Sequence, residues 1–189
     1  MKERAEEILV KYLKSDHLIK HSYALEAVMR EMAKKLEPEK EEEWAIAGLL
    51  HDLDADMLDY KENPEEAKKH GLVAAELLEK ENFGTEYMIQ GIKAHNEENG
   101  TERISILDKV IYAADPITGF ITAITLVYPD KKIASVKVKS ITKRMKEMRF
   151  AAGANRDAMK SIEDLGIPFA EFAEISLNAM QGVSNKLGL

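Results

Sequence analysis

The chain has 189 residues, of which 45% are hydrophobic and 32% charged, and its formal net charge is −7 at pH 7. This length suffices for one hydrophobic core, and no glycine-, serine- or proline-rich linker divides it, so we expect a single domain over residues 1–189. The absence of cysteine excludes disulfides, thiolate nucleophiles and cysteine-bound zinc, so any metal must bind histidine nitrogen and carboxylate oxygen.

Targeting and membrane segments are not expected. No apolar run approaches the roughly 18 residues that span a bilayer. The acidic, amphipathic beginning of the chain is unlike a signal or transit peptide. These features predict a cytoplasmic protein without a membrane partner.

Helical periodicity runs through most of the chain, and no segment alternates as a strand does. A first helix is predicted over 2–14, and a second from the Ser15-Asp16 break to about Leu36. In the second helix apolar residues recur every three or four positions, and His21 lies one turn before Leu25. His21 is therefore expected on the side that faces the core.

A third predicted helix starts at Pro38 and carries an apolar run that ends on a histidine and an aspartate. Trp44, Ala47 and His51 share one side of this helix. Asp52 follows His51 directly. A buried His-Asp pair is costly unless a partner such as a metal ion satisfies it, so this pair is the first candidate site.

Two further predicted helices each bring a histidine to an apolar face. The sequence from Asn63 to Glu66 combines an N-cap, a first-turn proline and a capping-box glutamate, and it begins a helix on which His70 shares a face with Ala74. Thr85 is a suitable cap for the next helix, in which His95 ends the apolar pattern.

The second half of the sequence begins with a long apolar helix that carries Asp115. Pro116 has no amide hydrogen and should disturb this helix beside the carboxylate. Three more helices are predicted over residues 133–148, 155–165 and 168–187. The fold class predicted for the whole chain is all-α, a single helical bundle of about eight or nine helices.

Six residues on five predicted helices are candidate metal ligands: His21, His51, Asp52, His70, His95 and Asp115. A single histidine on an apolar face is more often a hydrogen-bonded core residue than a ligand. Four of them together with a His-Asp dipeptide favour a metal site, because burying so many titratable groups without a cation is costly. Histidine and carboxylate ligands suit several divalent ions.

This ordered set resembles the HD superfamily of metal-dependent phosphohydrolases. The family signature is a first histidine, a later His-Asp dipeptide and a distant aspartate on separate helices. The matching positions and their contexts are Ile19-Lys20-His21-Ser22, Gly48-Leu49-Leu50-His51-Asp52-Leu53 and Val110-Ile111-Tyr112-Ala113-Ala114-Asp115. The resemblance covers about residues 18–127, so the helices of 131–189 are expected to pack on an HD core.

The resemblance implies one or two divalent metal ions as cofactor, with Mn, Fe, Co, Ni or Mg as candidates. His70 and His95 fall where many members with two ions have additional histidines, and Asp52 would then bridge the ions. The sequence departs from some dinuclear phosphodiesterases, which have paired histidines where this chain has His95-Asn96. They also often carry Gly-Lys after the dipeptide, where this chain continues with Leu53-Asp54. These departures argue against the cyclic-dinucleotide branch.

The activity that the resemblance implies is hydrolysis of a phosphomonoester or phosphodiester in a small, nucleotide-like substrate by a metal-activated water. Asp52 would act in catalysis through the metal, and Asp54 or Asp56 is a candidate for handling the proton. Substrate phosphates would be held by basic residues on the predicted helix over 133–148, for which the candidates are Lys139, Lys143 and Arg144. A charged helix stripe is also the pattern of an ordinary solvated face.

Two other functions remain open. The chain would be a metal-containing, nucleotide-binding regulatory module if it binds metal and nucleotide without turnover. Alternatively, the basic segment of residues 131–149 would recruit nucleic acid, although the negative net charge argues against nucleic acid as a partner.

Overall fold

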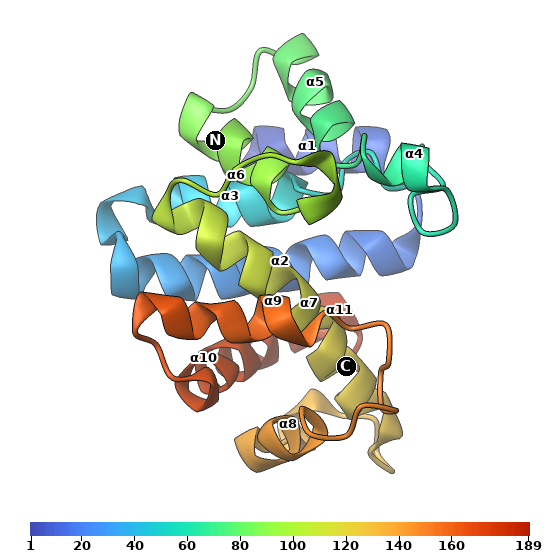
Figure 1. The fold of residues 1–189 in the computed structure, drawn as a ribbon, viewed down its shortest axis with the longest axis vertical. Coiled ribbons are helices and arrows are strands. Elements are labelled where there is room, and N and C mark those ends of the chain that lie inside the picture. The colour runs from blue at the N-terminus through green and yellow to red at the C-terminus, as the bar shows by residue number, and fades with distance from the viewer.

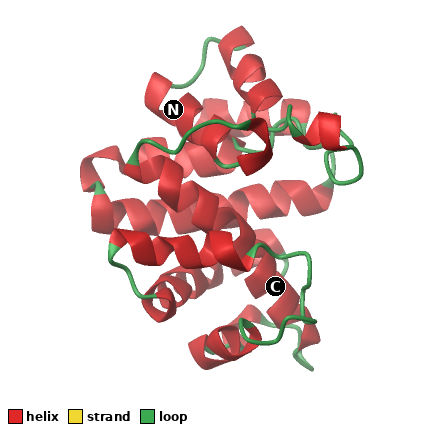
Figure 2. Cartoon of the chain, viewed as in Figure 1, coloured by secondary structure: helices red, strands yellow, loops and turns green.

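The computed structural model describes residues 1–189, and every regular element in it is helical. Figure 2 shows helices joined by loops, with no strand. The eleven α-helices are α1 (Lys2–Tyr12), α2 (Asp16–Leu36), α3 (Glu41–Leu50), α4 (Pro64–Ala67), α5 (Leu72–Lys80), α6 (Glu86–Ala94), α7 (Ile106–Val127), α8 (Val138–Arg144), α9 (Arg156–Lys160), α10 (Phe169–Gly182) and α11 (Ser184–Leu187). The all-α prediction is confirmed.

The predicted count of eight or nine helices is wrong because two of the predicted helices are divided. The helix expected after Pro64 breaks into α4 and α5 at Gly71, whose φ of 83° lies in the left-handed region. A Cβ there would also lie 3.0 Å from the carbonyl oxygen of Ile92. The helix expected over 168–187 breaks at Val183 into α10 and α11.

The basic segment is also less helical than its sequence predicts. Instead of one helix over 133–148, the chain forms a 3₁₀ turn at Ile133–Ser135 and the short helix α8. Val136, between them, has extended backbone angles and a buried side chain. Packing of this apolar residue takes precedence over the helical preference of its lysine-rich neighbours.

Helices α2 and α7 form the centre of the molecule (Figure 1). The N-terminal helices α1 and α3 to α6 lie on one side of this pair, and α8 to α11 lie on the other. Helix α3 packs closely on α2, since a Cβ on Gly48 would lie only 2.8 Å from the carbonyl oxygen of Leu25. This close approach places the end of α3 beside the middle of α2.

Helix α7 is the one helix long and apolar enough, by length and composition alone, to cross a membrane. In this structure it packs against α2, α6, α9 and α10, and Ile111, Ile117 and Ile121 are fully buried. A core helix passes the same test of length and composition. The helix continues through Pro116, so Asp115 lies inside a continuous helix rather than at a break.

A buried arginine organises the loop between α8 and α9. The guanidinium of Arg156 donates to five backbone carbonyl oxygens, those of Met145, Glu147, Phe150, Ala151 and Ala154, at 2.5–3.4 Å. Its side chain also lies over the ring of Phe120, and Phe120 packs edge-to-face on Phe150. One side chain therefore fixes most of the loop from Met145 to Ala154.

Replacing Arg156 with methionine keeps an unbranched apolar stem and removes all five N–H donors. We expect Arg156→Met to lower the free energy of unfolding by about 3 kcal/mol, because buried carbonyl groups lose charge-assisted hydrogen bonds. Urea denaturation followed by circular dichroism measures this change. Arg149→Met is the matched control, since Arg149 is exposed; equal midpoints for the two variants would contradict the role given to Arg156.

Candidate metal centre

His51 and His95 lie just beyond the ends of helices α3 and α6. Each ring points its Nδ1 back to a carbonyl oxygen three residues earlier, His51 to Gly48 at 2.9 Å and His95 to Ile92 at 2.5 Å. A carbonyl oxygen only accepts, so Nδ1 carries the proton in both rings. In the neutral ring, each Nε2 therefore carries a lone pair that is directed away from its own helix.

His21 lies inside α2 and is oriented by α7. Its Nδ1 is 2.9 Å from the hydroxyl of Thr118, which itself donates to the carbonyl oxygen of Asp115. Because that hydroxyl hydrogen is used, the hydroxyl oxygen accepts from His21 and leaves Nε2 as a lone pair. Thr118 lies one turn after Asp115 on the same side of α7 and is fully buried.

His70 lies in the turn before α5 and is held by two residues of the loop after α3. Its Nδ1 donates to Asp54 at 2.7 Å, and the ring of Tyr60 stacks on its face with centroids 4.2 Å apart and planes 10° apart. The other oxygen of Asp54 accepts from the backbone amides of Gly71 and Ala74 at the beginning of α5. Asp54 therefore fixes both the ring and the helix that follows it.

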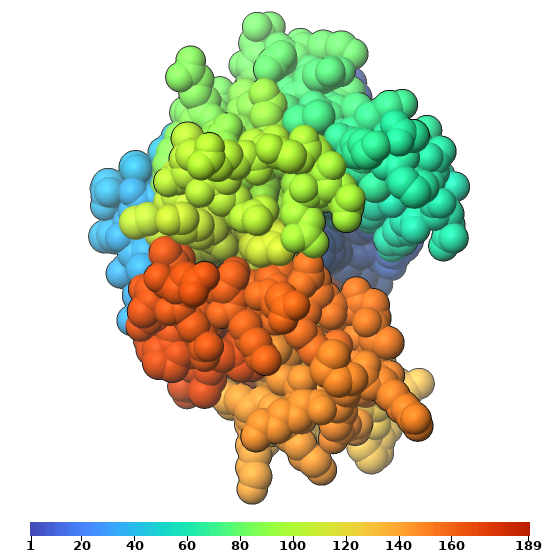
Figure 3. Space-filling model, in the orientation of Figure 1, coloured from blue at the N-terminus to red at the C-terminus, as the bar shows by residue number.

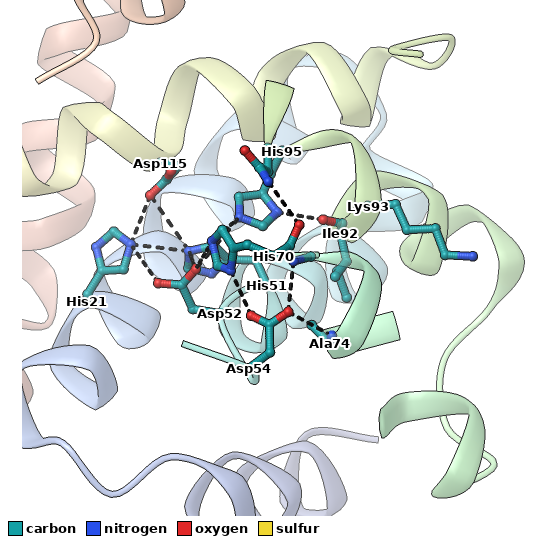
Figure 4. A network of polar contacts seen from close by, with 12 residues as sticks. His21, His51, Asp52, Asp54, His70, Ala74, Ile92, Lys93, His95 and Asp115 are labelled. Carbon is teal, nitrogen blue, oxygen red and sulfur yellow. Dashed lines mark hydrogen bonds and ion pairs between the residues drawn. The ribbon is translucent and has the colours of Figure 1, made fainter. Parts of the chain in front are cut away.

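The four Nε2 atoms converge around Asp52 (Figure 4). The Nε2 atoms of His21 and His51 are 3.2 Å apart, and those of His70 and His95 are 3.1 Å apart. One oxygen of Asp52 lies 3.2 Å from both the His51 and the His70 nitrogen. Asp115 adds an oxygen 2.9 Å from the His21 nitrogen.

This donor set fits divalent metal ions. With bonds of about 2.0–2.2 Å, neighbouring ligand atoms lie about 3.0 Å apart at a right angle and about 3.4 Å apart at a tetrahedral angle. The separations of 2.9–3.2 Å fall in this range. Lone pairs brought this close repel one another unless a metal ion or a proton lies between them.

Asp52 belongs to two groups that could each hold an ion. One group joins it to His21 and His51, and the other joins it to His70 and His95. A third group of His51, His95 and Asp115 overlaps both. A carboxylate shared by two groups is the arrangement in which two ions are bridged by one residue.

The electrostatics of the cluster also favour bound cations. Burial lowers the pKa of His51, but the carboxylates of Asp52 and Asp115 outweigh it and raise this pKa well above its ordinary value. Burial likewise lowers the pKa of His70, and Asp52 and Asp54 raise it to about 9. Burial raises the pKa of Asp52, yet the facing rings of His51 and His70 bring it well below the usual range.

His95 differs from its neighbours. Burial, together with the adjacent His70 and His51 rings, lowers its pKa to about 4, so its Nε2 is available as a neutral ligand.

A cavity of about 710 Å³ opens onto the cluster. Its wall includes His21, Asp52, His70 and Asp115, whereas His51 and His95 lie behind them. The side chains of His21 and Asp115 are 22% and 32% exposed, so this side of the cluster faces the opening. Figure 3 shows a hollow between the teal residues near 60 and the orange residues near 150, with blue residues of the N-terminal region behind it.

The remaining wall of the cavity is mostly apolar. Phe120 and Gly119 of α7 line it together with Ala151 to Asn155, the end of the loop that Arg156 holds. The polar side chain of Asn155 is already bonded to Glu97 and to the amide of Ala158. The cavity thus combines a polar floor at the cluster with a wall suited to an apolar ring.

The structure brings together all six sequence-predicted ligands, but it places the predicted proton-handling residues elsewhere. Asp54 is fully buried behind His70, and both of its oxygens are used there. Asp56 accepts from the amides of Lys14 and Ser15 at the start of α2. Neither carboxylate lines the cavity, and their catalytic role stays a prediction.

The predicted substrate-binding residues Lys139, Lys143 and Arg144 also lie outside this cavity. Lys143 and Arg144 line a smaller pocket between the end of α7 and α8. Arg144 is paired with Glu147 at 2.6 Å and lies over the ring of Phe150. Their role in substrate binding stays a prediction.

Sequence reasoning missed Thr118 and Tyr60, which orient His21 and His70. Thr118 follows Asp115 by three residues, and this one-turn spacing is a usable sign because it places both side chains on one helix face. No pattern in the sequence points to Tyr60, since its stacking on His70 depends on the path of an irregular loop.

Comparison with known proteins identifies the family. The model of the HD domain family matches residues 18–118, more than half of the chain. No curated protein and no solved structure matches it. The matched residues include every member of the converging cluster, from His21 to Asp115. The chain belongs to the HD domain family, a superfamily of metal-dependent phosphohydrolases.

Proposed function

We propose that this protein is a metal-dependent phosphohydrolase that cleaves a phosphomonoester or phosphodiester bond in a small, nucleotide-like substrate. The observation that carries the proposal is the convergence of four Nε2 atoms and two carboxylates on the floor of an open cavity. In this proposal Asp52 is shared by two sets of ligands, His21, His51 and Asp115 on one side of it and His70 and His95 on the other.

A bound divalent ion would lower the pKa of a coordinated water and neutralise charge on the phosphoryl oxygens. The residues of the chain orient the metal ligands and determine from which side substrate approaches. Asp54, Thr118 and the carbonyl groups of Gly48 and Ile92 hold the four imidazoles in the ligating orientation. His51 and His95 are buried, so solvent and substrate approach the cluster from the side of His21 and Asp115.

The size and the wall of the cavity support a substrate with an organic group attached to the phosphate. A volume of about 710 Å³ lies within the range of small-molecule sites. The apolar wall formed by Gly119 and Ala151 to Ala154 offers packing rather than hydrogen bonds, which suits the face of a nucleobase.

One prediction of the proposed function concerns the shared carboxylate. Asp52→Asn removes a negative charge from both groups of ligands, so we expect purified protein to retain at most one ion per chain instead of two, and to lose hydrolysis. Metal content is measured by inductively coupled plasma mass spectrometry. Asp59→Asn is the matched control, because Asp59 is exposed on the same loop. Equal metal content in the two variants would rule out Asp52 as the bridge.

A second prediction separates positioning from proton transfer at Asp54. Because Asp54 orients His70, Asp54→Asn should weaken Mn²⁺ binding about 10- to 100-fold, measured by isothermal titration calorimetry. Asp56→Asn should leave Mn²⁺ affinity unchanged, since Asp56 binds only the start of α2. Unchanged affinity in Asp54→Asn together with lost turnover would instead favour the proton-handling role.

The activity itself is tested on a panel of nucleoside monophosphates and dinucleotide diesters with Mn, Fe, Co, Ni and Mg. We expect phosphate release that depends on the metal and is lost in His51→Ala, because His51 contacts both carboxylates of the cluster. Phosphate release is followed colorimetrically. Saturable nucleotide binding without release under every metal would favour the regulatory module over the hydrolase.

A further inference from the structure

Outside the cluster, the charged side chains of the cavity wall are opposite in sign to the net charge of the chain. Although the protein carries a formal net charge of −7, the only carboxylate side chains on this wall are those of the cluster, Asp52 and Asp115. The other charged side chains that line it are Lys20 and Lys61, accompanied by His17. Away from the cluster, the side chains of the cavity therefore present only positive charge.

The loop after α3 produces this reversal by turning its carboxylates away. Asp54 is directed toward α5 and Asp56 toward the start of α2, so neither faces the cavity. From the same loop, Tyr60 and Lys61 do line the cavity. The loop, which also contains Asp52, Asp54, Asp56 and Asp59, thus contributes a cation to the site.

Both lysines are close in sequence to groups that build the cluster. Lys20 directly precedes His21 on α2, and Lys61 directly follows Tyr60, whose ring lies on His70. The two lysines come from separate segments and line the same cavity as His21, His70 and the two carboxylates of the cluster. A substrate that reaches the cluster through this cavity therefore meets two lysines on its wall.

Neither ammonium group is firmly engaged within the protein. Lys61 is exposed, forms no salt bridge, and has its ammonium group 5.6 Å from the centre of the Tyr60 ring. Lys20 is paired with Asp16 at 2.7 Å, one turn earlier on α2, but the Asp16 side chain is 80% exposed. Exposed pairs of this kind contribute little to stability, so exchanging Asp16 for a ligand costs little.

Building on the hydrolase function proposed above, we propose that Lys20 and Lys61 form an anion-binding subsite that holds a second phosphate group of the substrate, separate from the one that is cleaved. The ligand class is an organic phosphate with at least two phosphate groups. The lysines are specificity-determining residues: they bind the substrate and leave the metal-binding groups unchanged.

Binding of inorganic ions tests the subsite without any turnover. Isothermal titration calorimetry of the full chain with inorganic pyrophosphate and with orthophosphate should show tighter binding of pyrophosphate. In the double variant Lys20→Met, Lys61→Met we expect pyrophosphate affinity to fall at least tenfold and orthophosphate affinity to change less than twofold. Lys109→Met, an exposed lysine on α7, is the matched control and should leave both affinities unchanged.

Kinetics give a second readout where hydrolysis is observed. For a nucleoside diphosphate, Lys20→Met and Lys61→Met should each raise KM about fivefold to tenfold with kcat retained, and for the corresponding monophosphate KM should stay constant. Lys20→Arg should restore most of the lost affinity, since it keeps the charge. Circular dichroism of each variant confirms that the helical fold is intact.

The outcomes separate the subsite from the hydrolase function. Equal pyrophosphate affinity in the double variant and the wild type, or equal losses for both ions, would overturn the subsite even if the enzyme hydrolyses monophosphates. A selective loss of pyrophosphate binding in a protein that hydrolyses nothing would support the subsite and contradict the proposed function.

Discussion

The cluster depends on the hydrogen bonds made by the nitrogens that do not face its centre. Each of the four rings is fixed through Nδ1, by a carbonyl oxygen, a carboxylate or a hydroxyl, so that Nε2 is directed inward. In the neutral rings, this leaves Nε2 lone pairs 3.1–3.2 Å apart, an arrangement that is unfavourable unless a metal ion or a proton lies between them. The fold thus keeps these nitrogens in a mutually repulsive arrangement that a bound metal ion would relieve. Metal binding would therefore stabilise the fold as well as supply the chemistry.

The helices contribute to the electrostatic potential at the cluster as well as holding its ligands. Helices α3 and α6 both end at the cluster, so the carbonyl ends of two helices are directed toward the place where positive charge would collect. The N-terminus of α5 is the exception, and there the carboxylate of Asp54 accepts its free amides. Asp54 thereby shields the cluster from the positive end of a third helix while it orients His70.

The sequence was sufficient to predict the all-α fold and the six residues that converge, because helical spacing reports which side chains face the core. It was insufficient where the backbone leaves regular helix. The break at Gly71, which sets the position of His70, follows from a close approach to Ile92 that is distant in sequence. The five acceptors of Arg156 and the stacking of Tyr60 likewise depend on the path of irregular loops, for which residue type alone gives no direction.

The charge of the cavity wall is the clearest example of a property that the sequence alone does not reveal. The sequence suggests a basic surface on α8 and an acidic loop after α3, yet the acidic loop supplies Lys61 to the cavity and the basic helix contributes nothing to its wall. The sign of a site is set by which side chains a loop turns inward, and that is decided by hydrogen bonds such as those of Asp54 and Asp56. Once these two carboxylates are engaged elsewhere, the charges left facing the cavity are those that attract an anion to the cluster.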